Sequence, residues 1–257
     1  MSASSTFTPL RTVTATRYVT PLREGGSLPA LVEADDDGLY VLKFRGAGQG
    51  AKALVAELVG GEIARAVGLR VPEIVLIDLD PEMARAEPDP EIQDLIRASA
   101  GINVGLDYLP GSLPFVPHTS EDPDPVFAAD VVWLDAYLTN VDRTPRNPNL
   151  LRWHGNVWLI DHGAALYLQH AGLDPLLHAR RPFAQIADHV LLPYAGSIRE
   201  ADARLAPRLS EARLAEIVGA VPEAWVEGTG HEAYVEYLTR RLAAPRLFGE
   251  EADAARS

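Results

Sequence analysis

Short runs of apolar residues, separated by turn signals, dominate the first part of the chain. Residues 17–22, 30–34 and 39–44 are rich in Val, Leu, Tyr and Thr, and each run has the length of a strand. Gly and Ser residues separate the first two runs, and an acidic turn that ends in Asp-Gly separates the second from the third. The pattern therefore predicts a three-stranded meander.

Helix and strand patterns alternate after this meander. Residues 51–67 have the composition of a helix, and Gly68 is placed to end it as a C-cap. An apolar run at 71–78 predicts another strand. An acidic loop that contains proline is expected at 79–90, before a short helix at 91–98.

A further strand is expected at 101–109, and the chain then changes character. A Pro-Gly-Ser sequence and a Pro-rich, acidic stretch occupy residues 110–125. This change predicts a boundary between two parts of an α+β protein. Residues 1–109 would form a β-rich lobe, and residues 110–257 would form a mainly helical lobe.

Apolar positions crowd together at the start of the second part. Residues 126–139 predict a long, mostly buried helix, and 140–149 form a polar loop. Residues 150–153 and 157–160 predict a hairpin, because a turn sequence lies between two apolar runs. The remainder is expected to be largely helical, with a charged and frayed tail at 250–257.

Composition and charge narrow the classes of function. The net charge is −13, which disfavours nucleic acid as a partner, and there is no cysteine to form disulfides or thiolate metal sites. No segment has the about 18 uninterrupted apolar residues of a membrane helix. The first residues lack the pattern of a secretory signal, so a cytoplasmic location is expected.

The polar loop carries the first candidate chemistry. Asp142 is followed by Asn147 five residues later, and Asp161 opens an Asp-x-Gly turn after the next pair of strands. Kinases use this spacing: the first Asp orients or deprotonates the acceptor hydroxyl, and the Asn and second Asp hold Mg²⁺. The loop by itself also fits a plain turn, because Asp, Asn and Pro favour turns. Asp161 strengthens the catalytic interpretation, since it directly follows an apolar strand.

A lysine at the end of the third strand supplies the next candidate. Only Lys43 and Lys52 among the 23 basic residues are lysines. Lys43 is in the position from which a kinase lysine contacts nucleotide phosphates. Glu57 is the candidate partner, because it lies on a helix face of small and apolar residues where a carboxylate needs a cation. Glu62 is expected to be solvated, and a simple snorkelling role for Lys43 remains the alternative.

Two further features give weaker signals. The turn formed by Gly25, Gly26 and Ser27 could bring backbone N–H groups close to phosphates. Glycine turns between strands are common for steric reasons alone, and the chain has neither a GxxxxGK[ST] nor a GxGxxG motif. His162 follows Asp161, and we expect it to pack rather than to contact substrate.

Taken in order, these motifs resemble those of a known family. The residues that carry the resemblance are Gly25-Gly26-Ser27-Leu28-Pro29, Leu42-Lys43-Phe44, Glu57 in a helix that ends Ala66-Val67-Gly68-Leu69, Asn140-Val141-Asp142-Arg143 through Asn147, and Leu159-Ile160-Asp161-His162-Gly163. The set is similar to HipA-like kinases and, more distantly, to type II phosphatidylinositol 4-kinases. The resemblance covers residues 14–168, and the C-terminal helices carry no motif that belongs to it.

The resemblance implies a two-lobed, protein-kinase-like α+β fold with ATP as phosphoryl donor and Mg²⁺ as metal. It implies that Lys43 contacts the phosphates and that Glu57 is its partner. Asp142 would be the catalytic Asp, while Asn147 and Asp161 would bind the metal. Each of these assignments is an expectation for the structure to meet.

Adenine binding leaves little side-chain signature, because hinge contacts to nucleotides are backbone contacts. We expect backbone groups at Asp107, Tyr108 and Leu109 to make them. The metal assignment has an alternative within the same loop, since Asn149 competes with Asn147.

The chain also departs from the family pattern. It is shorter than the HipA toxin, and the toxin's separate N-terminal subdomain is not expected here. Toxin activity and a DNA-bound antitoxin partner therefore do not carry over. HipA proteins often have His as the third-position residue after the catalytic Asp, whereas here Thr144-Pro145-Arg146 follows Asp142-Arg143.

The main hypothesis is an ATP-dependent kinase that acts on a hydroxyl acceptor, with a protein Ser or Thr favoured over a small molecule or a phosphoinositide. The acidic surface favours a basic peptide over an acidic lipid headgroup. Two alternatives stay open: a nucleotide-binding pseudokinase that acts as an interaction module, and an unrelated α+β binding protein.

Overall fold

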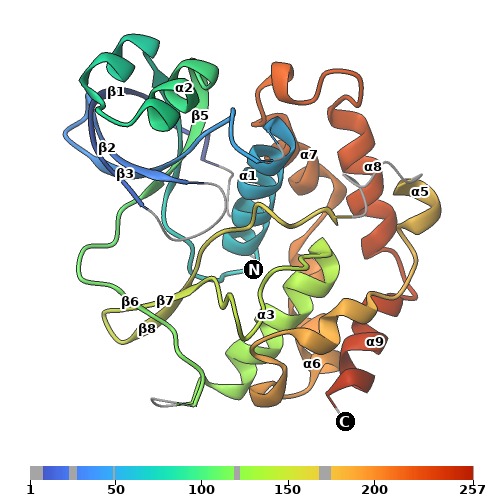
Figure 1. Cartoon of the computed structure of the whole chain (residues 1–257). Helices are drawn as coiled ribbons and strands as arrows, with labels where there is room; N and C mark the ends of the chain where they lie inside the picture. Colours follow the sequence, from blue (N-terminus) through green and yellow to red (C-terminus); the bar gives the residue numbers. More distant parts are fainter. Residues whose placement is uncertain (1–7, 23–27, 49, 119–121, 168–174, 257) are drawn as a thin grey trace.

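The computed structural model describes residues 8–22, 28–48, 50–118, 122–167 and 175–256 and combines a strand-rich part with a helix-rich part (Figure 1). The strands are β1 Thr12–Pro21, β2 Ala30–Ala34, β3 Leu39–Lys43, β4 Ile74–Leu79, β5 Gly101–Asp107, β6 Leu113–Pro114, β7 Leu150–Trp153 and β8 Asn156–Leu159.

Helices fill most of the C-terminal half and three segments of the N-terminal half among the described residues. The α-helices are α1 Ala51–Ala66, α2 Pro90–Ala98, α3 Pro125–Leu138, α5 Pro175–His178, α6 Ile198–Leu205, α7 Glu211–Gly219, α8 His231–Leu242 and α9 Leu247–Ala255. The 3₁₀ helices are η1 Pro81–Ala86, η2 Ala184–Asp188, η3 Leu192–Tyr194, η4 Ala206–Arg208 and η5 Glu223–Trp225.

Five strands close into a barrel in the order β1-β2-β3-β5-β4. The meander β1-β2-β3 was predicted, but the barrel was not. Closure depends on β1, which pairs antiparallel with β2 and parallel with β4. The predicted first strand began at residue 17, whereas β1 begins at Thr12. Val13 and Ala15 are buried in this additional segment, because pairing with β4 turns their side chains into the barrel.

Apolar side chains form two core clusters. One fills the barrel and includes Val32, Leu42 and Ile77. The other joins α1 and parts of β4 and β5 to the C-terminal helices, and α1 contacts α7 directly (Figure 1). Helix α1 thus contacts elements on both sides of residue 109, namely α7 and η5 after it and β4 and β5 before it. The division into two lobes stays a prediction.

Helix α1 is buried along almost its whole length. Because its neighbours cover it from several sides, it also buries Glu62, which we had expected to be solvated. That expectation was wrong: Glu62 is 8% exposed, and Arg65 lies 3.4 Å from its carboxylate. Burial raises the pKa of Glu62 above its ordinary value.

Helix α3 is the central helix of the second cluster, as its apolar pattern predicted. Ten of its residues are buried. Trp133 and Tyr137 stack on each other, and both contact Phe248 of α9. The prediction of a frayed tail from residue 250 was wrong, because Phe248 and Ala252 share one helix face and pack into this core.

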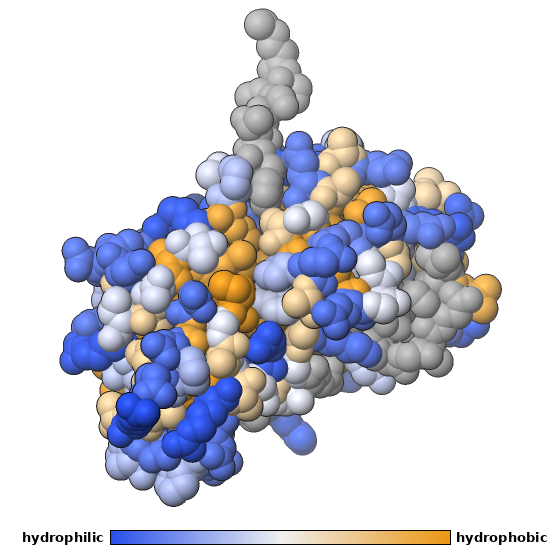
Figure 2. Space-filling view, turned by 90° about the horizontal axis from the view of Figure 1, so that it is seen from above, coloured by the Kyte–Doolittle hydropathy of each residue, from blue (hydrophilic) through white to orange (hydrophobic). Residues whose placement is uncertain are grey.

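The surface seen from above is mainly hydrophilic, and hydrophobic residues on that face gather near its middle (Figure 2). Among the described residues, no helix has the length and apolar character needed to cross a membrane.

Candidate functional site

Lys43 ends β3 and contacts two carboxylates that are far from it in the sequence. Its Nζ atom lies 2.9 Å from Asp161 Oδ1 and 3.9 Å from Glu57 Oε2. Burial by itself would lower the pKa of Lys43, but the charges of Glu57, Asp161 and Asp142 raise it above its ordinary value. Lys43 is therefore charged at neutral pH and is shared between the two carboxylates.

Glu57 lies on α1, opposite the turn that contains Asp161. Its side chain is buried, and His162 Nδ1 is 3.8 Å from its Oε1 atom. Burial favours the neutral form, but Lys43 and His162 together hold the pKa of Glu57 below its ordinary value. The small residues predicted around Glu57 leave space for the turn of His162. A Cβ atom at Gly60 would lie only 2.9 Å from His162 Cβ. Gly60 thus lets the turn approach the helix.

The loop predicted to be catalytic folds around Asp142. Its Oδ2 atom accepts hydrogen bonds from Asn147 Nδ2 at 2.7 Å and from Asn149 Nδ2 at 3.3 Å. The Asn140 side chain accepts a hydrogen bond from the Asp142 backbone N–H at 3.1 Å. Both candidate metal-binding asparagines therefore lie against Asp142, and either can present its amide oxygen to a cation.

A buried carboxylate beneath this loop was missed by the sequence analysis. Asp135 is on α3, and its side chain is fully buried. It accepts hydrogen bonds from Arg143 Nε at 2.5 Å, Asn140 Nδ2 at 3.0 Å and His189 Nε2 at 2.9 Å. Burial would raise the pKa of Asp135, but Arg143 and His189 keep it well below its ordinary value. A charged residue inside an otherwise apolar, buried helix was the signal that could have identified it.

Arg143 connects the loop to the turn that carries Asp161. Its Nη1 atom donates to the backbone carbonyl of Asn149 and, at 3.1 Å, to that of Ile160. The Ile160 N–H in turn donates to the Asn149 carbonyl at 3.1 Å. Asp161, directly after Ile160, has a left-handed backbone with a φ of 55°. One buried guanidinium therefore fixes the position of Asp161 relative to Asp142.

The donors at this site suit a hard divalent cation. Within the described chain, no three His, Cys, Asp or Glu residues are grouped as a preformed metal site. Asp161 together with Asn147 or Asn149 would supply one carboxylate and one amide oxygen, which is a small set of the kind Mg²⁺ accepts when phosphate and water complete its shell. The residues present therefore fit a metal that binds together with a nucleotide.

Only part of the predicted adenine site is free to bind a ligand. The Asp107 N–H donates to the Glu73 carbonyl at 2.8 Å, and the Tyr108 N–H donates to the Leu39 carbonyl at 2.9 Å. The Leu109 N–H has no such partner among the described residues. Among the three N–H groups, Leu109 provides the donor that adenine could use. The predicted phosphate loop, Gly25, Gly26 and Ser27, lies outside the described residues.

Comparisons with known proteins agree with this geometry. The family model for HipA-like kinases matches residues 16–244. A solved structure of the Helicobacter pylori proinflammatory kinase CtkA has a TM-score of 0.64 and 14% identity, over 96% of this chain and 98% of that one.

A second solved structure describes the Golgi casein kinase, with a TM-score of 0.51, 11% identity and coverage of 95% of this chain and 74% of that one. The same kinase with Mn and ADP bound has a TM-score of 0.53 and 12% identity, over 97% and 74% of the two chains. No curated protein matches the chain in sequence. At these identities the structural likeness shows a kinase fold, as predicted.

Proposed function

Because the chain belongs to the HipA-like kinase family, a family of phosphotransferases, we propose that it transfers the γ-phosphoryl group of ATP to a hydroxyl group of an acceptor protein. The observation that carries this proposal is the convergence of Lys43, Asp142 and Asp161. Lys43 pairs with Asp161, and Arg143 ties the loop of Asp142 to the residue before Asp161. Phosphoryl transfer needs such a set, because catalysis is mostly positioning and charge neutralisation.

Each residue has a distinct proposed role. Lys43 contacts the phosphates, and Glu57 keeps its charge in place. Asp142 orients the acceptor hydroxyl and takes its proton, while Asn147 and Asp161 hold Mg²⁺. The metal supplies neutralisation of the triphosphate charge, which a protein with a net charge of −13 otherwise repels. The Leu109 N–H binds the adenine ring.

The acceptor is proposed to be a Ser or Thr of a protein. The loop of Asp142 leads directly into an exposed turn at Pro145 and Arg146, which leaves room for a polypeptide beside the catalytic group. A small molecule or a phosphoinositide is the competing acceptor class, and an acceptor panel that includes both separates them.

The experiment that tests the function compares Asp142→Asn and Asp161→Asn with the wild type. General base catalysis is worth about 10²–10⁴-fold, so Asp142→Asn is expected to lose most phosphoryl transfer while it keeps most of its affinity for Mg-ATP. Asp161→Asn removes a metal ligand and is expected to weaken Mg-ATP binding itself. Calorimetry with and without excess chelator measures binding, and mass spectrometry of added phosphate measures transfer.

Two outcomes would change the assignment. Wild-type protein that binds Mg-ATP but phosphorylates neither itself nor any acceptor in the panel would be a pseudokinase. Transfer that is undiminished in Asp142→Asn would keep the kinase but reject Asp142 as the catalytic base.

A further inference from the structure

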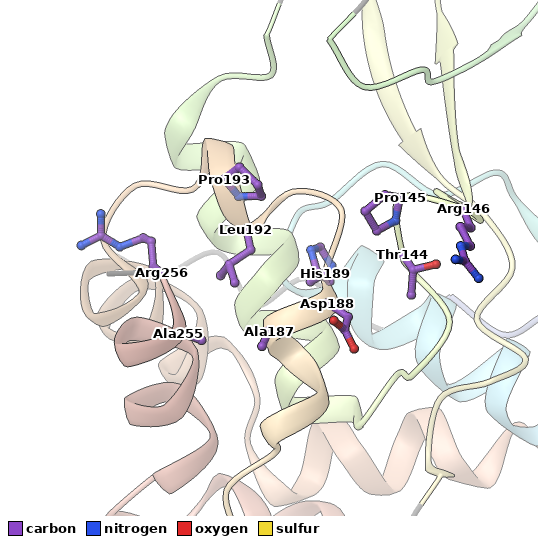
Figure 3. Close-up of a pocket in the computed structure, with 10 residues that line it drawn as sticks. All are labelled: Thr144, Pro145, Arg146, Ala187, Asp188, His189, Leu192, Pro193, Ala255 and Arg256. Atoms are coloured by element: carbon purple, nitrogen blue, oxygen red, sulfur yellow. The ribbon is translucent and has the colours of Figure 1, made fainter.

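A pocket of about 860 Å³ lies beside the loop of Asp142 (Figure 3). Its volume is within the about 300–1,000 Å³ of typical ligand sites. Residues from three segments that are distant in the sequence line it: Thr144, Pro145 and Arg146 from the loop, residues 187–189 and 192–193 from the chain around η2 and η3, and Ala255 and Arg256 at the end of α9. None of these residues has a role in the proposed phosphoryl transfer.

Arg146 is held at a fixed position relative to Asp142. The Thr144 N–H donates to the Asn147 carbonyl at 3.1 Å, and the Asn147 N–H donates back to the Thr144 carbonyl at 3.0 Å. Pro145 and Arg146 therefore form the tip of a closed turn. Both ends of this turn bond to Asp142, through its carbonyl at 3.0 Å and its carboxylate at 2.7 Å. A group bound by Arg146 consequently lies within a few residues of a hydroxyl bound at Asp142.

The pocket contains a cationic side chain without an acidic partner in the described part of the chain, although the protein as a whole carries a net negative charge. Arg146 is exposed and forms no ion pair with any residue that the structure describes. Across the pocket, Asp188 is exposed, and Arg256 lies 3.8 Å from Asp253 of its own helix. His189 is uncharged at neutral pH, because burial lowers its pKa. Among the described residues, Arg146 thus has no acidic partner, in a protein with a net charge of −13.

We propose that this pocket binds the acceptor polypeptide and that Arg146 selects an Asp or Glu side chain close to the phosphorylated Ser or Thr. This proposal rests on the proposed function, since it names the substrate class of that site. An arginine fork binds a carboxylate through two parallel hydrogen bonds, which gives direction as well as affinity. The overall negative charge does not prevent this, because surface charges beyond about 8 Å are screened at physiological salt. The expectation of a basic peptide from net charge alone is replaced by the local arrangement.

Because Arg146 and Asp142 are close together, the acidic residue of the acceptor must be close in sequence to its Ser or Thr. An extended chain advances about 3.3–3.6 Å per residue, so the carboxylate is expected within about three residues of the acceptor hydroxyl. Asp188 repels an acidic residue on its own side of the pocket, so an acidic residue on only one flank of the acceptor is expected to bind favourably.

The experiment measures peptide binding, so that it does not depend on transfer. Four fluorescein-labelled hexapeptides each carry one central serine: two have a pair of glutamates before or after it, and two have glutamines in the same places. Fluorescence anisotropy with the full chain is expected to show one glutamate peptide binding about three- to tenfold tighter than its glutamine match, as for a charge-assisted pair near the surface.

Three variants test the assignment. Arg146→Gln is expected to abolish the difference between the glutamate and glutamine peptides, and Asp188→Asn to increase it about two- to threefold. The matched control is Arg199→Gln, because Arg199 is exposed on α6, outside the pocket, and the same change of charge there should leave the difference intact.

Each result decides one question. No binding by any peptide, equal binding of glutamate and glutamine peptides, or a difference that survives Arg146→Gln would overturn the proposal. If the glutamate preference requires Arg146 but no acceptor is phosphorylated, then the pocket assignment stands and the proposed kinase activity fails. If serine is phosphorylated without any glutamate preference, then the kinase stands and the assignment of Arg146 fails.

Discussion

The loop of Asp142 and the site of Lys43 are held in place by different kinds of contact. Under the loop, Asp135 accepts hydrogen bonds of 2.5–3.0 Å from Asn140, Arg143 and His189. At the lysine site, neither Glu57 oxygen accepts a hydrogen bond from the described residues. Lys43 Nζ is 3.9 Å from Glu57 Oε2, and His162 Nδ1 is 3.8 Å from Glu57 Oε1.

This difference indicates how the two sites would work. Short, charge-assisted hydrogen bonds in a dry interior fix orientation, which suits a group that must point at an acceptor hydroxyl. A longer ion pair allows the ammonium group to adjust. That suits Lys43, which is proposed to contact the phosphates of a bound nucleotide.

The largest loss of stability is expected when Asp135, which anchors the loop of Asp142, is removed. Asp135→Ala leaves the guanidinium of Arg143 buried without its carboxylate, and a buried charge that loses its partner costs about 3–5 kcal/mol of unfolding free energy. Urea unfolding followed by circular dichroism measures this loss. The control is Asp94→Ala, which removes an exposed ion pair with Arg97 and should cost less than about 1 kcal/mol. A similar small loss in both variants would mean that Asp135 does not anchor the loop.

An intermediate effect is expected where packing, not hydrogen bonding, joins the turn of His162 to α1. In Gly60→Ala the new methyl group meets His162 Cβ at 2.9 Å, and such overpacking costs about 1–3 kcal/mol. Gly219→Ala is the matched control, because nothing described lies within 4 Å of a Cβ there. It should be neutral or stabilising by up to about 1 kcal/mol. If both variants gain stability in thermal unfolding, then the turn does not press against the helix.

The smallest effect is the pH dependence of stability that arises from His189, which is hydrogen-bonded to Asp135 beneath the loop. The Leu191 N–H donates to His189 Nδ1 at 3.0 Å, so the ring proton is on Nε2 and bonds to Asp135. Burial lowers the pKa of His189 in the folded state, so below the ordinary pKa of about 6.5 the unfolded chain binds more protons. Stability should therefore fall as the pH falls through that value.

The measurement compares urea unfolding at pH 7.5 and 5.5. The wild type is expected to lose about 1 kcal/mol from this group, and His189→Asn should show a correspondingly flatter dependence. His154→Asn, at an exposed turn residue, should retain the slope of the wild type. An unchanged slope in His189→Asn would mean that this histidine is not kept neutral by burial.

Much of the fold was predictable because the local pattern of apolar and polar residues indicates which side of a helix or strand is buried. The meander, the helix of Glu57, the buried helix α3 and the hairpin β7-β8 followed from periodicity and turn residues. The errors share one cause. The early start of β1, the buried Glu62 and the ordered α9 depend on what packs against these segments, and periodicity contains no information about the partner.

The sequence by itself determined the α+β class, the kinase-like order of motifs and the candidate residues Lys43, Glu57, Asp142 and Asp161. Only the tertiary structure decided that Asp135 and His189, which are 54 residues apart, meet beneath the loop, and that Arg146 faces a pocket. The physical reason is that a charge is stabilised by the groups opposite it in space. Those groups come from elements brought together by long-range packing, and no local pattern marks them.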